Sequence, residues 1–300
     1  MTSSSSFNLP DQTGRTVVVT GANSGIGFEA SRRLAAAGAH VVLACRSLDR
    51  GHEAAARIDG STEVRELDTA SLASVNAFAD GLDRPIDVLI NNAGIMAVDE
   101  ARSVDDFELQ LATNFLGAFA LTGLLLDRLT DRVVMLSSQA HRIGRIALDD
   151  LNWRHRRYSR WGAYGQSKLA DLMFAYDLQH RLTAAGSPLR AVAAHPGIAS
   201  TALTRGLHMP PWVEAISVAV INGFGQSPEG GALPTLYAAT VGDLPGGSYI
   251  GPSGPGEMRG APVAVGSSKA SHNRDVQRLL TSEAERLTGV ALRIPSPARR

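Results

Sequence analysis

The sequence contains one cysteine, Cys45, among its 300 residues. No intrachain disulfide can form, so the cysteine usage gives no indication of an exported, cross-linked fold. Charged residues make up 19% of the chain and the formal net charge is zero, which gives no reason to expect a nucleic acid or an anionic membrane as partner. Aromatic residues make up 5% and are too scattered to form a stacking platform for bases.

Long apolar runs are also absent. Residues 115–126 form the longest one, about a dozen residues interrupted by Gly117 and Gly123, whereas roughly 20 are needed to span a bilayer. Residues 1–14 show neither the basic start nor the apolar core of a signal peptide, and we interpret them as a mobile leader. No His, Cys and Asp residues have the spacing of metal ligands, so we expect no metal site. These absences favour a cytoplasmic protein without a membrane span.

Short β-branched runs alternate with helical segments along the chain. Strands are expected at residues 17–19, 41–44, 64–67, 86–90, 132–136, 189–194 and 249–250. Helices are expected from the first glycine-rich turn to near Gly38 and at residues 49–58, 71–79, 107–129 and 161–182. This alternation predicts one α/β domain over residues 1–300, built on a doubly wound (Rossmann) parallel sheet that is covered on both faces. In such a sheet the ligand crevice lies at the carboxyl ends of the strands, where the strand order reverses.

Three regions interrupt this pattern. Residues 144–160 form a basic, irregular connection, and residues 251–300 form a C-terminal extension. Residues 199–228 are rich in proline, glycine and apolar side chains, and we interpret them as a flexible substrate lid. An apolar lid indicates a lipophilic small molecule as substrate. The alternative is that these side chains pack onto the body of the protein or into an oligomer interface.

A glycine-rich turn follows the first expected strand. Its residues are Gly21, Ala22, Asn23, Ser24, Gly25, Ile26 and Gly27. Glycines let the backbone turn sharply and approach a phosphate, and the N-terminus of the next helix offers unpaired N–H groups. An ordinary strand-to-helix turn is the alternative, but the position between the first strand and the first helix favours a dinucleotide-binding loop.

The residues after the second strand indicate which dinucleotide is bound. Sites for NAD usually place a carboxylate there, whereas an arginine accommodates the additional phosphate of NADP. Here the neutral Cys45 is followed by Arg46, whose guanidinium can pair bidentately with a phosphate. We therefore predict NADP(H) as the cofactor, with Ser47 and Arg50 as helpers. The alternative is that Arg46 is a solvated surface charge.

The ends of the third and fourth strands carry further candidates. Asp68 either accepts a hydrogen bond from the adenine amino group or caps the helix that starts near Ser71. Asn92, Ala93 and Gly94 follow the fourth strand, where small residues would let the backbone run along the cofactor. A plain polar turn is the alternative for these three residues.

Tyr164 and Lys168 are the candidates for proton transfer. Positions i and i+4 of a helix lie on one face, and an ammonium beside a phenol favours the phenolate. Tyr164 can then give a proton to a carbonyl oxygen or take one from an alcohol, and Lys168 can also donate to the nicotinamide ribose. Ser138, after the fifth strand, would donate a hydrogen bond to the same oxygen, with Ser137 as the fallback. Asn114 either holds a water that connects Lys168 to solvent, or makes a local kink or a polar contact between helices.

The motifs that resemble a known family are residues 20–27 and 91–94 together with Asn114, Ser138, Tyr164 and Lys168. They are similar to those of the short-chain dehydrogenase/reductase family, over roughly residues 14–250. The resemblance implies about seven strands in the order 3-2-1-4-5-6-7, with Tyr164 as acid/base, Lys168 and Asn114 in a proton relay, and Ser138 orienting the substrate. It also implies a segment that contacts the nicotinamide carboxamide and opens the lid, with residues Pro196, Gly197, Ile198 and Thr201.

Residues 43–46, 137–141 and 161–170 resemble more closely the retinol dehydrogenase-like branch and its bacterial relatives, whose members generally prefer NADP(H). The resemblance thus implies an oxidoreductase that interconverts a carbonyl and an alcohol by hydride transfer, on a lipophilic small molecule. Dimers and tetramers are usual in the family, so it also implies a homo-oligomer. Two other functions stay open: a non-catalytic NADP(H) sensor, against which the complete catalytic set argues, and epimerase, dehydratase or enoyl reductase chemistry on the same fold.

Overall fold

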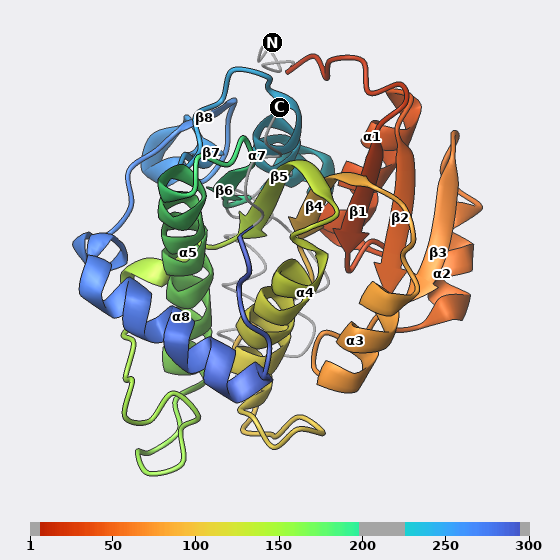
Figure 1. The fold of residues 1–300 in the computed structure, drawn as a ribbon. Helices are drawn as coiled ribbons and strands as arrows, with labels where there is room; N and C mark the ends of the chain where they lie inside the picture. Colours follow the sequence, from red (N-terminus) through yellow and green to blue (C-terminus); the bar gives the residue numbers. More distant parts are fainter. Residues whose placement is uncertain (1–6, 198–225, 295–300) are drawn as a thin grey trace, which may run out of the picture.

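The computed structural model describes residues 7–197 and 226–294, and their strands form one eight-stranded sheet (Figure 1). The strands are β1 (Thr16–Thr20), β2 (His40–Cys45), β3 (Thr62–Glu66), β4 (Ile86–Asn91), β5 (Leu129–Leu136), β6 (Arg190–Ala194), β7 (Tyr249–Pro252) and β8 (Pro262–Ala264). Their spatial order is β3-β2-β1-β4-β5-β6-β7-β8, with β1 to β7 parallel and β8 antiparallel to β7. The predicted fold class and the order of the first seven strands are confirmed, and β8 is added at the edge.

Helices cover both faces of this sheet. The elements between the strands are α1 (Gly25–Ala36), α2 (Leu48–Ala55), α3 (Leu72–Asp80), the π-helix η1 (Leu111–Leu116), α4 (Gly117–Leu125), the 3₁₀ turn η2 (Gln139–Arg142), α5 (Arg160–Ala184), α7 (Pro228–Thr240) and the 3₁₀ turn η4 (Pro255–Glu257). Val17 and Val19 of β1 pack with α1, α2 and α7, whereas Val18 packs on the other face with α3, α4 and α5. Such alternation explains why the strands read as continuous apolar runs, since each face has its own core.

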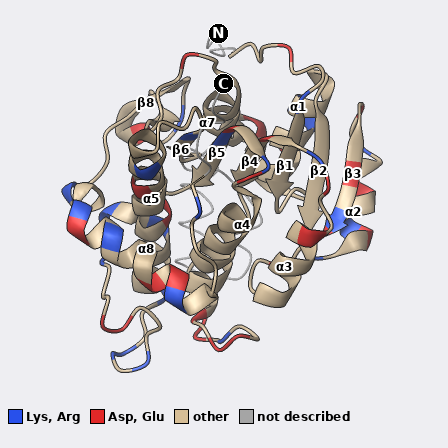
Figure 2. Cartoon of the chain, viewed as in Figure 1, with Lys and Arg blue, Asp and Glu red and all other residues tan. Residues whose placement is uncertain are grey.

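The C-terminal extension adds a further layer. The 3₁₀ turn η5 (Lys269–His272) leads into α8 (Arg274–Thr288), which lies against α5 and α4 on the outside of the helical layer (Figure 1). Leu280 and Ala284 of α8 are fully buried in the core of that face. Lys and Arg are interspersed with Asp and Glu over the helices and loops in Figure 2.

Residues 7–14, the described part of the expected mobile leader, contact the body of the protein, and their mobility stays a prediction. Gln12 is buried and donates to the carbonyls of Pro10 and Asp11, and the Phe7 ring lies 5.3 Å from the ring of Tyr237 on α7. An apolar ring and a buried amide explain why this segment packs on the body. The expected lid lies outside the described residues, except that Ser227 caps α7 and Pro228 begins it.

The single helix expected over residues 107–129 is also wrong. The segment is irregular to Glu108, becomes helical at Leu109, widens into η1, continues as α4 to Leu125, and has already become β5 at Leu129. Leu129 pairs with Ile86 of β4, so the sheet overrides the helical apolar pattern at that end. The shorter helix places Asn114 inside the π-helix.

Candidate active site

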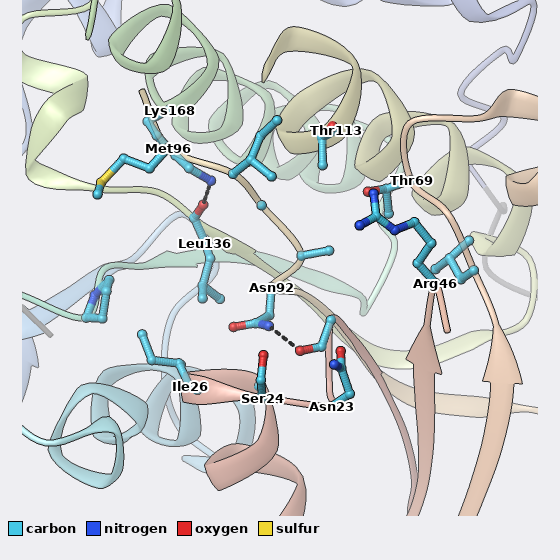
Figure 3. Close-up of a pocket in the computed structure, with 18 of the residues that line it drawn as sticks. Asn23, Ser24, Ile26, Arg46, Thr69, Asn92, Met96, Thr113, Leu136 and Lys168 are labelled. Carbon is cyan, nitrogen blue, oxygen red and sulfur yellow. Dashed lines mark hydrogen bonds between the residues drawn. The ribbon is translucent and has the colours of Figure 1, made fainter. Parts of the chain in front are cut away.

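A pocket of about 480 Å³ opens at the carboxyl ends of the central strands (Figure 3). The predicted site residues that line it are Gly21, Asn23, Ser24, Gly25, Ile26, Gly27, Arg46, Asp68, Asn92, Ala93, Gly94, Tyr164, Lys168 and Pro196. The predicted residues Ser47, Asn114, Ser138 and Gly197 are not part of its lining. Ile198 and Thr201 lie outside the described residues. The fold therefore brings most of the residues singled out in the sequence to one hollow.

The turn after β1 has the features of a phosphate site. Gly21 and Gly25 have φ values of 67° and 56°, which non-glycine residues rarely adopt, and the turn feeds directly into α1. Ser24 occupies the N-cap position of α1, but its side chain makes no capping hydrogen bond and is exposed. Its hydroxyl and the N–H groups of the first turn therefore remain available for an anion.

Gly27 keeps α1 close to this turn. A Cβ atom at residue 27 would lie 2.4 Å from the Asn92 Nδ2 atom and 2.4 Å from the Gly21 carbonyl oxygen. The Asn92 side chain is held there because it donates to the Thr20 carbonyl at 2.8 Å, and the Thr20 hydroxyl accepts from the Asn92 and Ala93 backbone N–H groups. Thr20, the first residue of the motif predicted at residues 20–27, therefore ties the end of β1 to the end of β4.

The end of β2 presents Arg46 to the pocket, on the same side as Asn23 and Thr69 in Figure 3. Ser47 is the N-cap of α2, where its hydroxyl accepts from the Arg50 N–H at 3.4 Å. Burial raises the pKa of the Cys45 thiol to about 11, which makes this cysteine unreactive. Arg46 is thus the positively charged group that the β2 end offers to a ligand.

Asp68, at the end of β3, lines the pocket, and its Oδ1 atom accepts from the Ala70 N–H at 2.9 Å. Ser71, whose hydroxyl accepts from the Ser74 N–H, is the N-cap of α3. The capping role considered for Asp68 is therefore wrong. The adenine contact stays a prediction.

α5 carries Tyr164 and Lys168 one turn apart, and both line the pocket. The Trp161 ring lies edge-on to Tyr164 at 6.1 Å, and within the described part of the chain the Tyr164 hydroxyl has no hydrogen-bond partner. The Lys168 ammonium donates to the Leu136 carbonyl at 2.8 Å and to the Asp171 carboxylate at 2.9 Å. Two of its three N–H donors are thus used, and one remains for the pocket. The sequence analysis did not single out Asp171.

The two serines after β5 differ in what their hydroxyls do. Ser137 is buried and donates to the Lys168 carbonyl at 2.7 Å, so its proton is committed to α5. Ser138 is half-buried, and its hydroxyl only accepts, from the Ala140 N–H at 3.2 Å. Its own O–H has no acceptor among the described residues, which favours Ser138 as the donor to a substrate oxygen, whereas Ser137 is the serine that lines the pocket.

The Asn114 side chain joins the loop after β4 to α5. Its amide donates to the Ile95 carbonyl at 3.0 Å and to the Ser167 hydroxyl at 2.8 Å, and its oxygen accepts from the Ile95 N–H at 2.8 Å. Both amide hydrogens are thus used by protein groups, and the residue lies in a π-helix. The polar contact and the distorted helix considered for Asn114 are present, and the water relay stays a prediction.

His195, at the end of β6, orients the segment that begins with Pro196. Its Nδ1 atom accepts from the Gly197 N–H at 3.2 Å, so the neutral ring carries its proton on Nε2 and donates it to the Glu257 carboxylate at 2.9 Å. Burial lowers the pKa of His195 to about 4, although Glu257 opposes this shift. The ring is therefore neutral near pH 7 and acts as a structural link between Gly197 and Glu257.

Among the described residues, no helix is both long and apolar enough to cross a membrane. Over residues 7–197 and 226–294, no group of three or more His, Cys, Asp or Glu side chains could hold a metal ion.

Comparison with known proteins identifies the class to which this site belongs. The sequence model of the short chain dehydrogenase family matches residues 15–210. The chain therefore belongs to the short-chain dehydrogenase family, a class of oxidoreductases that interconvert alcohol and carbonyl groups with a nicotinamide cofactor.

Several individual proteins are similar to this chain. Retinol dehydrogenase 13 of Homo sapiens is 39% identical over 293 residues, which cover 92% of this chain and 85% of that protein. Polyprenol dehydrogenase of Mus musculus is 39% identical over 300 residues, 94% of this chain and 86% of that protein. A solved structure of an uncharacterized protein from Mycobacterium paratuberculosis has a TM-score of 0.83 and 49% identity, covering 95% of this chain and 97% of that one.

A more distant solved structure was determined with NADP. It is named as a putative NAD(P)-dependent gluconate 5-dehydrogenase from Beutenbergia cavernae with NADP bound at low occupancy, and it has a TM-score of 0.60 at 28% identity. The match covers 78% of this chain and 92% of that one. The chain is thus similar in sequence to a retinol dehydrogenase and a polyprenol dehydrogenase.

Proposed function

We propose that this protein is an NADP(H)-dependent oxidoreductase that interconverts a lipophilic alcohol with its ketone or aldehyde. The observation that carries the proposal is the Tyr164 hydroxyl, which lines the pocket without a hydrogen-bond partner among the described residues and lies one helical turn from the Lys168 ammonium. The names of the relatives, retinol and polyprenol dehydrogenases, support a lipophilic alcohol as substrate.

The residues present fit a dinucleotide. A Cβ atom at Gly27 would fill the close approach between α1 and the turn at Gly21, and the Ser24 hydroxyl is left without a capping role. Arg46 supports the preference for NADP(H), because a guanidinium binds the additional phosphate and no carboxylate follows directly at the end of β2. The nicotinamide ring supplies or accepts the hydride when the cofactor is bound.

The protein side of the reaction is proton transfer. Tyr164 gives its proton to the carbonyl oxygen during reduction and takes one from the alcohol during oxidation. Lys168 contributes positive charge that favours the phenolate, and its remaining N–H can hold the nicotinamide ribose. Ser138 donates its free O–H to the same substrate oxygen and stabilises the negative charge that develops there.

The test is a screen of lipophilic aldehydes, ketones and alcohols, followed through the absorbance of NADPH, with the wild-type protein and with Tyr164→Phe. We expect turnover in the wild-type protein, loss of about 10²-fold or more in the variant, and retained cofactor binding. Near-normal turnover by Tyr164→Phe would contradict the assignment. Cofactor binding without turnover of any substrate would instead identify a sensor, and reaction without net oxidation would identify epimerase chemistry.

A further inference from the structure

One face of α5 carries three ionisable side chains in a row. Tyr164, Lys168 and Asp171 occupy positions i, i+4 and i+7, which share a face of a helix. The Asp171 Oδ2 atom lies 2.9 Å from the Lys168 Nζ atom, and the two side chains are 1% and 7% exposed. The carboxylate is thus in direct contact with the lysine that stands beside the proton donor.

The carboxyl group of Asp171 has little other support. Its second oxygen, Oδ1, is buried and has no hydrogen-bond partner in the described part of the chain. Burial raises the pKa of Asp171 to about 6, and the Lys168 ammonium is what opposes this shift. A buried carboxylate with one free oxygen contributes little to stability by itself, because its desolvation offsets the attraction within the pair. The contact with Lys168 therefore explains why a carboxylate is buried at position 171.

The elements packed against α5 bring no second charge to Asp171 within the described residues. Lys168 is the charged group whose field acts on its carboxyl. Other charged or titratable groups of these elements have partners of their own: Arg142 with Glu257, Arg132 and Arg190 with Asp131, Arg278 with Asp275, Arg286 with Glu283, and His272 with Ser267. His141 of η2 is buried, which lowers its pKa, and Lys269 and Arg274 are exposed.

We propose that Asp171 is a positioning residue for catalysis, which holds Lys168 as an ammonium ion and fixes its Nζ atom between the Leu136 carbonyl and the pocket. The structural part of this proposal concerns Lys168 alone. Its catalytic part rests on the proposed function, since the charge on Lys168 matters for turnover only if Tyr164 transfers the proton.

Removal of the carboxylate charge has a defined consequence. In Asp171→Asn the amide oxygen can still accept from Nζ, but a buried ammonium without a counter-ion is disfavoured relative to the free amine. The phenol of Tyr164 would then lose its neighbouring positive charge. Alcohol oxidation, which needs a phenolate, would require a higher pH.

The structural part of the proposal, which concerns Lys168, can be measured directly because the chain contains few lysines. Lys168 and Lys269 are the two lysines of the whole sequence, so a protein labelled with ¹³C at the lysine ε-carbon gives two side-chain signals. Lys269→Arg removes the exposed one and assigns the other. Asp177→Asn is a matched control, because Asp177 is also a buried aspartate of α5 but pairs with Arg181 at 2.7 Å.

We expect the Lys168 signal of Asp171→Asn to contain more of the free amine than the wild-type signal at the same alkaline pH, and that of Asp177→Asn to be unchanged. The wild-type protein provides a second measurement that does not depend on folding of the variant. Its Lys168 signal should show an additional inflection in the acid range, where Asp171, whose pKa burial raises above the ordinary carboxyl value, gains a proton. A Lys168 signal that is indifferent to Asp171→Asn, or a wild-type Lys168 signal without an inflection anywhere in the acid range, would overturn the proposal.

Kinetics test the catalytic part. The acid limb of the pH profile for alcohol oxidation should move to higher pH in Asp171→Asn, with recovery of kcat at alkaline pH and an unchanged cofactor Kd. A purely structural role of Asp171 would lower the rate at every pH and leave the acid limb in place. A loss confined to KM would also leave the acid limb in place. Either result would contradict the catalytic part of the proposal. A wild-type protein without turnover would refute the proposed function, whereas the NMR titration would still decide the role of Asp171.

Discussion

The substitution Gly27→Ala tests whether the close contact between α1 and the turn after β1 forms the cofactor site. The added Cβ atom would lie 2.4 Å from both the Gly21 carbonyl oxygen and the Asn92 Nδ2 atom, whereas ordinary contacts of a Cβ lie at 3.4–4 Å. Either α1 or the backbone and side chain facing it, at Gly21 and Asn92, therefore has to move by about 1 Å. Neither neighbour is free to move, because the Gly21 N–H donates to the Ala44 carbonyl and the Asn92 amide donates to the Thr20 carbonyl.

The magnitude follows from these contacts. Overpacking of this kind costs about 1–3 kcal/mol, and loss of the Asn92 hydrogen bond costs about 1 kcal/mol more. A loss of roughly 3 kcal/mol corresponds to a decrease in Tm of about 6–12 °C for a chain of this size. A turn displaced by about 1 Å also loses at least one charge-assisted hydrogen bond to a phosphate, which raises the Kd for NADP(H) about tenfold or more.

The assay combines thermal unfolding with a fluorescence titration of NADPH. Gly242→Ala is the control, because a Cβ atom there meets nothing within 4 Å and the residue does not have a positive φ. We expect the control to keep both Tm and Kd. If Gly27→Ala also kept both values, the contact between α1 and the turn would not support the cofactor site, and the reasoning would be refuted.

Two further predictions concern charged residues. Arg46→Asp should shift the ratio of catalytic efficiencies from NADP(H) toward NAD(H) by about tenfold or more, since a phosphate loses its cation and meets a carboxylate; an unchanged ratio would show that the phosphate is held elsewhere. Asp131→Asn should destabilise the protein by about 2 kcal/mol near neutral pH, because Asp131 pairs with Arg15, Arg132 and Arg190. Although burial opposes it, Arg132 and Arg190 hold the pKa of the Asp131 carboxyl below the ordinary value. A lowered pKa in the folded state gives stability that is present above about pH 3.8 and is lost as the pH falls further, so the difference in Tm between variant and wild type should shrink in acid; a constant difference at every pH would contradict it.

The sheet could be predicted from the sequence because its strands are short apolar runs with two buried faces. Val41 to Ala44 is an example, since every one of these residues is buried and the run ends at a polar turn. β8 was not predicted, because its three residues begin with a proline and only their antiparallel pairing with β7 defines it as a strand. The irregular stretch before η1 was missed since apolar periodicity does not report where a helix widens.

In the candidate site, too, some residues could be predicted from the sequence and others could not. Gly27 and Tyr164 could be predicted, because their positions after β1 and on α5 belong to a motif that sequence spacing alone displays. Asp171 could not, because burial of that face depends on helices distant in sequence that pack around α5, α8 among them. The different roles of Ser137 and Ser138 also follow from three-dimensional contacts, since the sequence places two identical hydroxyls side by side.

The π-helix η1 fixes the length of the chain between two contacts. Asn114 reaches Ile95 and Ser167, and a few residues later Gly117 touches the backbone of Thr69, where a Cβ atom would lie 2.0 Å from the carbonyl oxygen. Because each residue of a helix rotates the chain by about 100°, deletion of one residue from η1 would turn Gly117 away from Thr69 whenever Asn114 kept its partners. Single-residue insertions and deletions should therefore be excluded from this segment during divergence, even where substitutions are accepted.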